Sequence, residues 1–296
     1  MKGGPRGACP PRVYPAAEMS DSRPIGVFDS GVGGLTVLRE LRHQAPGERV
    51  IYVADLAHFP YGPRPQAEVR RLALDIIDLL VGLDVKLVVA ACNTATAAAL
   101  NAARERFDIP VLGVIAPGAQ AAAAATRNGR VAVLSTEGTL RSQEYVHTIR
   151  EANPGVVVLG IAAPRLVDVV EAGEAGTAAA EAALRETVQP ALDWGADTIV
   201  LGCTHYPLLR HDLARVLAGR RITVIDSADT TAARVVRVLE VNRLGAGARA
   251  RGGFEVLVTA SPRRFSDAAA RLFGEQTPVA RLVRRGRPAL QAVASS

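Results

Sequence analysis

Cysteine, lysine and aromatic residues are all scarce in this chain of 296 residues. The three cysteines, Cys9, Cys92 and Cys203, are odd in number and lack paired spacing, which argues against a disulfide framework and for a reducing cytoplasm. Aromatic residues make up 4% of the chain, so Val, Leu, Ile and Ala must fill the core. Because no apolar run approaches the roughly 20 residues that span a bilayer, we expect a cytoplasmic protein without a membrane partner.

Lysine is limited to Lys2 and Lys86. Lys2 lies in a stretch rich in Gly and Pro, and Lys86 begins an apolar run, so neither is a good candidate for a Schiff base with pyridoxal phosphate. Chemistry at an amino-acid carbon would therefore proceed without that electron sink. We expect no cofactor.

Positive charge is in modest excess, with a net charge of +6. The arginines are spread along the chain, with a small excess near its carboxyl end, as in Arg281, Arg284, Arg285 and Arg287. No long basic run with interleaved aromatic residues occurs, so nucleic acid is not an expected partner.

Apolar runs of strand length alternate with helical stretches throughout. Most of the runs are continuous, which is typical of parallel strands buried on both faces. A helix is expected from the turn after Leu134 through about Arg150. The expected strands are Ile25–Phe28, Val50–Ala54, Leu87–Ala91, Val111–Ile115, Val131–Leu134, Val156–Ile161, Thr198–Leu201, Ile222–Ile225, Phe254–Val258 and Val279–Leu282.

The pattern predicts an α/β fold with two pseudo-symmetric parallel-sheet domains and the active site between them. The first domain is expected to comprise residues 24–115 and 226–285, and the second residues 116–225. Residues 1–23 are rich in Gly, Pro, Arg and Ser and lack periodicity, so they are predicted to be a disordered extension. Residues 286–296 are predicted to be a loose tail.

Two cysteines occupy matching positions in the two halves. Cys92 follows the apolar run that ends at Ala91, and Cys203 follows Thr198–Leu201 and Gly202. Each leads into a helical stretch, so each thiol is expected at the carboxyl end of a buried strand, where α/β proteins bind ligands. The start of a helix carries free N–H groups and partial positive charge, which shifts a thiol toward thiolate.

Several chemistries are compatible with two such thiols. A buried free cysteine is often only a small apolar residue. Cys92, Cys203 and His205 could supply three metal ligands, although the spacing typical of structural zinc sites is missing. Cys203 with His205 or His58 could form a nucleophile pair, which would leave Cys92 without a role. A two-base proton transfer employs both thiols, one removing and one donating a proton on opposite sides of a carbon.

Polar residues at other strand ends are further candidates. Asp29 and Ser30 follow the first strand, and the glycines after them permit a tight turn into a helix. The loop His58–Pro63 contains two prolines and a glycine around Tyr61, which describes either a stiff loop over a site or a surface turn. Asn93, Thr94, Thr204 and His205 directly follow the cysteines and can hydrogen-bond a ligand.

Four motifs occur together in this chain: Val27-Phe28-Asp29-Ser30-Gly31-Val32-Gly33-Gly34-Leu35, Pro60-Tyr61-Gly62, Ala91-Cys92-Asn93-Thr94-Ala95 and Gly202-Cys203-Thr204-His205-Tyr206-Pro207. In residues, order and spacing they resemble the glutamate racemase family, over about residues 25–282. Related aspartate racemases usually carry an acidic residue at the position of His205.

The resemblance implies cofactor-independent interconversion of L- and D-glutamate, supplying D-glutamate for peptidoglycan. It implies that Cys203 faces the α-proton of L-glutamate and Cys92 that of D-glutamate, while Asp29 and His205 tune the thiols and Glu171 assists on one side. A homodimer is the expected assembly. The implied substrate-binding residues are Asp29, Ser30, Tyr61, Gly62, Asn93, Thr94, Thr204 and His205.

The segment before Glu171 departs from the family pattern. Ala163 stands where relatives often have a cysteine, and Arg165 and Asp168 are more polar than expected. Two other functions stay open from sequence: a racemase or isomerase of another small acid such as aspartate, and a non-catalytic regulatory protein on the same fold.

Overall fold

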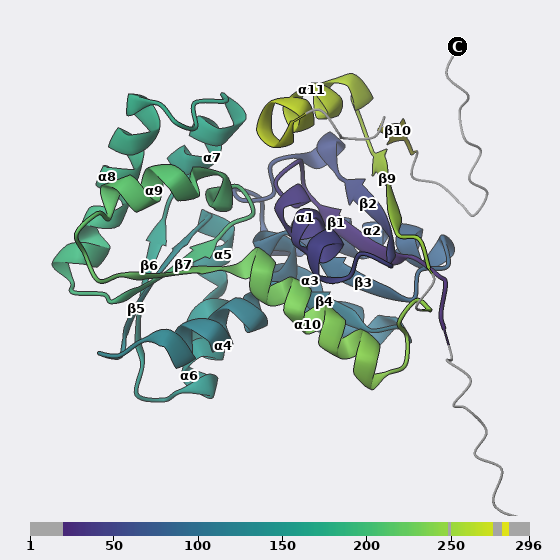
Figure 1. Ribbon diagram of the computed structural model, residues 1–296, viewed down its shortest axis with the longest axis horizontal. Coiled ribbons are helices and arrows are strands. Elements are labelled where there is room, and N and C mark those ends of the chain that lie inside the picture. Colours follow the sequence, from purple (N-terminus) through teal and green to yellow (C-terminus); the bar gives the residue numbers. More distant parts are fainter. Residues whose placement is uncertain (1–19, 248–249, 275–279, 284–296) are drawn as a thin grey trace, which may run out of the picture.

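Two parallel β-sheets lie side by side, each flanked by helices (Figure 1). The computed structural model describes residues 20–247, 250–274 and 280–283. The six-stranded sheet has the order β10-β9-β2-β1-β3-β4 and the four-stranded sheet the order β6-β5-β7-β8. The strands are β1 Ile25–Asp29, β2 Arg49–Ala54, β3 Leu87–Ala90, β4 Val111–Gly113, β5 Arg130–Ser135, β6 Val157–Ala162, β7 Thr198–Gly202, β8 Thr223–Asp226, β9 Gly253–Val258 and β10 Arg281–Leu282.

The two halves repeat one topology. In each sheet the four strands of the half lie in the spatial order second, first, third, fourth. Every described strand pair is parallel. The first sheet adds β9 and β10 beyond β2. This arrangement confirms the predicted α/β class with two parallel sheets, although the sheets differ in size.

Helices cover both faces of each sheet. One face of the first sheet packs on α1, α10 and α11 and the other on α2 and α3, whereas the second sheet lies between α7–α9 and the pair α4 and α6. The helices are α1 Leu35–Gln44, α2 Gln66–Gly82, α3 Asn93–Arg106, α4 Ile115–Ala125, α5 Glu137–Ser142, α6 Glu144–Ala152, α7 Pro164–Glu171, α8 Ala178–Asp193, α9 Arg210–Val216, α10 Ser227–Val241 and α11 Pro262–Phe273, with 3-10 helices η1 Leu56–His58 and η2 Tyr206–Leu209.

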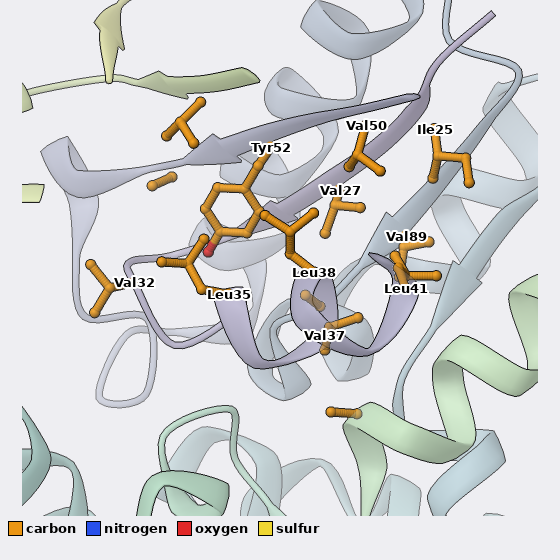
Figure 2. Packing of buried hydrophobic residues seen from close by; sticks show 14 of the residues in the cluster. Ile25, Val27, Val32, Leu35, Val37, Leu38, Leu41, Val50, Tyr52 and Val89 are labelled. Atoms are coloured by element: carbon orange, nitrogen blue, oxygen red, sulfur yellow. The ribbon is translucent and has the colours of Figure 1, made fainter. Parts of the chain in front are cut away.

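The apolar face of α1 packs onto the first sheet and forms part of the core of the first half. Leu35, Leu38 and Leu41 recur at helical spacing and point onto the sheet (Figure 2), where they meet Val27 and Tyr52. Burying one such aliphatic side chain contributes about 1.5–3 kcal/mol. The packing fixes the start of α1 against the end of β1, where Asp29 lies.

The chain crosses between the sheets and returns. After β8, helix α10 packs against α1 of the first half and α4 of the second, and β9 then pairs with β2. The domain boundaries at residues 24–115 with 226–285, and 116–225, stay a prediction. Residues 1–19 of the predicted extension and the predicted tail at 286–296 lie outside the described residues.

Some element boundaries predicted from sequence were wrong. The strand expected at Val111–Ile115 ends at Gly113, because Ile115 already begins an alanine-rich helix with a proline in its first turn. The helix expected to run through Arg150 is broken at Gln143, which adopts φ 58°. The Ser142 hydroxyl accepts the Glu144 N–H there, so side-chain bonding replaces helix continuity.

Replacement of Tyr52 by phenylalanine is expected to destabilise the β1–α1 turn. The buried Tyr52 hydroxyl donates a 2.7 Å hydrogen bond to the Gly31 carbonyl. Its loss leaves a buried carbonyl unpaired, which costs about 1–3 kcal/mol. Urea unfolding measures this as a lower midpoint, with exposed Val241→Ala as a control expected to change little. An unchanged midpoint in Tyr52→Phe would contradict the prediction.

Candidate functional site

A cavity of about 230 Å³ lies where the carboxyl ends of the two sheets face each other. It is lined from both halves, so neither sheet alone forms it. The lining residues are Ser30, Phe59, Pro60, Tyr61, Gly62, Pro63, Cys92, Asn93, Thr94, Thr136, Glu137, Pro164, Val167, Asp168, Cys203, Thr204 and His205. The structure therefore brings both predicted thiols to one cavity.

Cys92 is the N-cap residue of α3. Its sulfur accepts the Ala95 N–H at 3.5 Å, and its thiol lies 4.0 Å from the Ser30 hydroxyl oxygen. The side chain is almost fully buried. Burial raises the pKa of the Cys92 thiol well above its ordinary value, and the negative charge of Asp29 adds to this. The predicted shift of the Cys92 thiol toward thiolate was therefore wrong, because the desolvation of the thiol outweighs the effect of the helix start.

Cys203 differs from Cys92 in its surroundings. It directly follows β7, but a turn and the 3-10 helix η2 come next, so the predicted match to a helix start was wrong here. The turn instead brings His205 back beside the thiol, with Nδ1 3.9 Å from Sγ. The Cys203 thiol therefore faces an imidazole, whereas the Cys92 thiol faces the N–H groups at the start of α3.

His205 connects Cys203 to Glu171. Its Nε2 lies 2.9 Å from Glu171 Oε1, across from the Nδ1 that faces the thiol. Burial alone lowers the pKa of His205, but the hydrogen bonds to Cys203 and Glu171 outweigh burial and raise it to about 10. The direction of this shift favours the imidazolium form of His205. Burial raises the Glu171 pKa, yet its bond to His205 and the charges of Arg264 and Arg271 lower it overall.

Asp29 lies behind the cavity wall rather than in its lining. Its Oδ2 accepts the Gly34 N–H at 2.8 Å and the Thr204 hydroxyl at 3.4 Å. Its Oδ1 is buried and has no hydrogen-bond partner among the described residues. A buried carboxylate oxygen without a donor is suited to a cationic group of a ligand.

The loop predicted at His58–Pro63 forms one wall of the cavity. The Tyr61 hydroxyl donates to Asp55 at 2.6 Å, which anchors the loop to the end of β2. Across the cavity, the Gly62 carbonyl accepts the Gly138 N–H of α5 at 3.0 Å. Of the two interpretations open from sequence, the structure favours a loop over a site, because residues 59–63 line the cavity.

Asn93 and Thr94 offer polar atoms at the start of α3. Asn93 Oδ1 accepts a hydrogen bond from the Tyr145 hydroxyl at 2.8 Å, while its buried Nδ2 has no hydrogen-bond partner among the described residues. Thr94 Oγ1 lies 2.9 Å from Thr136 Oγ1 of the other half. Side chains from both halves therefore meet on the cavity wall.

Sequence reasoning missed several lining residues, namely Thr136, Glu137, Val167 and Asp168. For Thr136 a signal was present. It follows β5, the first strand of its half, just as Ser30 follows β1, so the repeated topology places both at one edge. Glu171, by contrast, does not line the cavity and reaches it only through His205.

No group of three or more His, Cys, Asp or Glu side chains that could hold a metal ion occurs in residues 20–247, 250–274 and 280–283. Cys92, Cys203 and His205 are among these residues and form no such group with a further ligand. The described helices also include none that is long and apolar enough to cross a membrane.

Comparison with known proteins gives consistent matches. The Asp/Glu/hydantoin racemase family matches residues 25–235. A glutamate racemase of Exiguobacterium sibiricum is 46% identical over 225 residues, 76% of this chain and 83% of that protein. One of Streptococcus agalactiae is 41% identical over 266 residues, 89% of this chain and 99% of that protein.

A solved structure shows the same arrangement. Glutamate racemase isoform RacE1 of Bacillus anthracis matches with a TM-score of 0.84 and 36% identity, and the match covers 90% of this chain and 98% of that one. Sequence and fold thus agree over nearly the whole length. The chain belongs to the glutamate racemases of the Asp/Glu/hydantoin racemase family.

Proposed function

We propose that the protein interconverts L- and D-glutamate by a two-base mechanism in which Cys92 and Cys203 exchange the α-proton without a cofactor. The observation that carries this proposal is that both buried thiols, which follow the third strand of each half, line one cavity. A hydrolase would need only one of them. Racemisation needs an acid and a base on opposite faces of the same carbon.

The two thiols are assigned different starting roles. Cys203 removes the proton of L-glutamate, and its thiolate form is accompanied by the His205 imidazolium and the Glu171 carboxylate. Cys92, whose pKa is raised by burial, holds its proton and donates it to the opposite face. In the reverse direction the roles exchange, with Asp29 and Ser30 beside Cys92.

Substrate binding relies on neutral donors. Among the described residues that line the cavity there is no lysine or arginine. We infer that the substrate carboxylates bind hydroxyl, amide and backbone N–H groups of Ser30, Gly62, Asn93, Thr94 and Thr204. The buried carboxylate of Asp29, behind the cavity wall, attracts the ammonium group by its charge. Tyr61 and His205 complete the wall.

The same resemblance extends the proposal to the cell. D-Glutamate made here would serve peptidoglycan synthesis in the cytoplasm. Two free cysteines in the described chain suit a reducing compartment. A homodimer is proposed as the assembly, and sedimentation of the purified protein measures it.

Circular dichroism of purified protein with L-glutamate and, separately, D-glutamate tests the proposed function without any added cofactor. We expect the signal to decay to zero from both sides. Turnover of aspartate in preference to glutamate would replace the substrate while leaving the two-thiol chemistry intact. No turnover of either acid would favour a non-catalytic protein on this fold.

Substitution Glu171→Gln is expected to lower kcat/KM about tenfold, with a change in pH dependence. His205 has a pKa raised to about 10 by Cys203 and Glu171, so its proton is lost only as pH rises through that value. Without the carboxylate that pKa falls, and the alkaline limb of kcat/KM moves to lower pH.

The raised pKa of His205 also links folding stability to pH. The contribution of protonated His205 to the free energy of unfolding is full below about pH 6.5 and is lost as the pH rises toward 10.

The control for this substitution is Glu137→Gln, because Glu137 also lines the cavity but lies on α5. For Glu137→Gln, the alkaline limb of kcat/KM is expected to stay near that of the unmodified protein. Identical limbs in Glu171→Gln and the unmodified protein would contradict the assigned role of Glu171.

A further inference from the structure

Helix α11 connects the two halves of the molecule beside the site. Its residues Phe265, Ala268 and Ala269 are buried in the core of the first half, where the Phe265 ring lies 6.2 Å from the ring of Tyr52. Near its end, Leu272 packs against the cores of both halves. Figure 1 shows α11 next to α7 of the second half. An element anchored in one half therefore reaches the helix that carries Glu171.

Arg271 makes the polar contact between these helices. Its Nη2 donates a 2.9 Å hydrogen bond to the carbonyl oxygen of Glu171, the last residue of α7. Carbonyls in the last turn of a helix have no partner within the helix, so a cationic donor from outside satisfies one of them. Gly173 lies beside the arginine stem, and a Cβ there would approach Arg271 Cδ to 2.9 Å. The chain thus leaves space for this side chain.

A series of contacts connects Arg271 to the Cys203 sulfur. Arg271 binds the Glu171 backbone, the Glu171 carboxylate lies 2.9 Å from His205, and His205 lies 3.9 Å from Cys203. Arg264, seven residues earlier and therefore on the same face of α11, lines a crevice together with Glu171. The face of α11 that carries Arg264 and Arg271 is therefore directed at Glu171.

We propose that Arg271 is a positioning residue for the Cys203 half of the reaction: from the first half of the molecule it holds the end of α7 where the Glu171 carboxylate meets His205. This inference rests on the proposed function, because it assigns a role within the same site. Arg271 touches neither the cavity nor the thiol, so it acts only through Glu171.

Positioning and simple charge predict opposite pH shifts. The charged groups that face Glu171 are His205, Arg264 and Arg271, and those that face His205 are Cys203, Glu171 and Asp29. If Arg271 acted only as a nearby cation, its removal would favour the imidazolium and raise the pKa of His205. If it positions Glu171, its removal weakens the bond to His205 and lowers that pKa.

The test compares Arg271→Met with Arg271→Lys and with Arg263→Met, an exposed arginine of the same helix. For Arg271→Met we expect kcat/KM about three- to tenfold lower, mainly through kcat. The fall must be equal for both enantiomers because they have equal free energies. The alkaline limb should move to lower pH, Arg271→Lys should recover part of the loss, and Arg263→Met should change neither.

The same substitution is then made in a Glu171→Ala background, where no carboxylate remains to be positioned. We expect Arg271→Met to add little there; an undiminished loss would overturn the inference, as would a shift of the limb to higher pH. NMR titration of His205 gives a readout independent of turnover. A lowered His205 pKa in Arg271→Met supports the positioning role even if the proposed racemisation fails, and an unchanged one refutes it.

Discussion

Alanine at either Cys92 or Cys203 is expected to reduce the racemisation of glutamate by about 10³-fold or more. Proton transfer by a positioned side chain contributes about 10²–10⁴-fold, and inversion needs transfer on both faces in the same turnover. Both thiols are nearly fully buried in the cavity wall, so water is poorly placed to replace either one. Circular dichroism at saturating L- or D-glutamate measures the loss.

Exchange of the α-proton in D2O gives this prediction a sharper form. The thiol that remains takes the α-proton of the enantiomer facing it, exchanges with solvent, and returns a deuteron to the same face. Cys92→Ala should therefore label L-glutamate without inverting it, and Cys203→Ala should label D-glutamate. Cys9→Ala, at a cysteine outside the described residues, is the control and should racemise normally. Labelling of the opposite enantiomers would reverse the assigned faces.

Alanine at Gly33 is expected to lower kcat/KM by about 10²-fold, because displacements near 1 Å in a catalytic site have costs of that order. Gly33 lies in the turn between β1 and α1. A Cβ there would lie 2.4 Å from Thr204 Oγ1 and 2.7 Å from His205 Nδ1. Both side chains are buried and cannot swing into solvent, so the turn after Cys203 must move.

Gly82→Ala is the matched control for Gly33→Ala. Gly82 ends α2, and a Cβ there would meet no atom within 4 Å. Replacing a glycine with alanine at such an open position is neutral or slightly stabilising. We expect unchanged kinetics for Gly82→Ala, and thermal unfolding of both variants separates a local effect from a loss of fold. Normal activity in Gly33→Ala would contradict the contact between the two halves.

The repeated topology explains why the cavity could be anticipated without coordinates. Parallel strands place their carboxyl ends at one edge, so the polar residues directly after Ala91, Gly202 and Phe28 are predicted to lie in the same region. The same rule applied to β5 would have added Thr136. Val167 and Asp168 were beyond this rule, because they project from α7 rather than from the end of a strand.

The local sequence pattern did not predict the different environments of the two thiols. Cys92 and Cys203 each follow a buried strand, yet only Cys92 caps a helix. The 3-10 turn after Cys203 depends on how Tyr206 packs, with its hydroxyl bonded to the Ala163 carbonyl at 2.8 Å. A contact across 43 positions thus decides which neighbours the sulfur has.

Local sequence by itself determined most strands and helices and the residue types at the strand ends, because apolar periodicity and turn chemistry act over a few neighbouring residues. The alternation of apolar strands with helices predicted the parallel sheets. Tertiary structure alone decided which of these groups meet. Glu171 joins His205, and Arg271 joins Glu171 across 100 positions, only because α7 and α11 pack beside each other. The tertiary structure also sets the pKa shifts: burial and Asp29 raise the pKa of Cys92, and the hydrogen bonds to Cys203 and Glu171 raise that of His205.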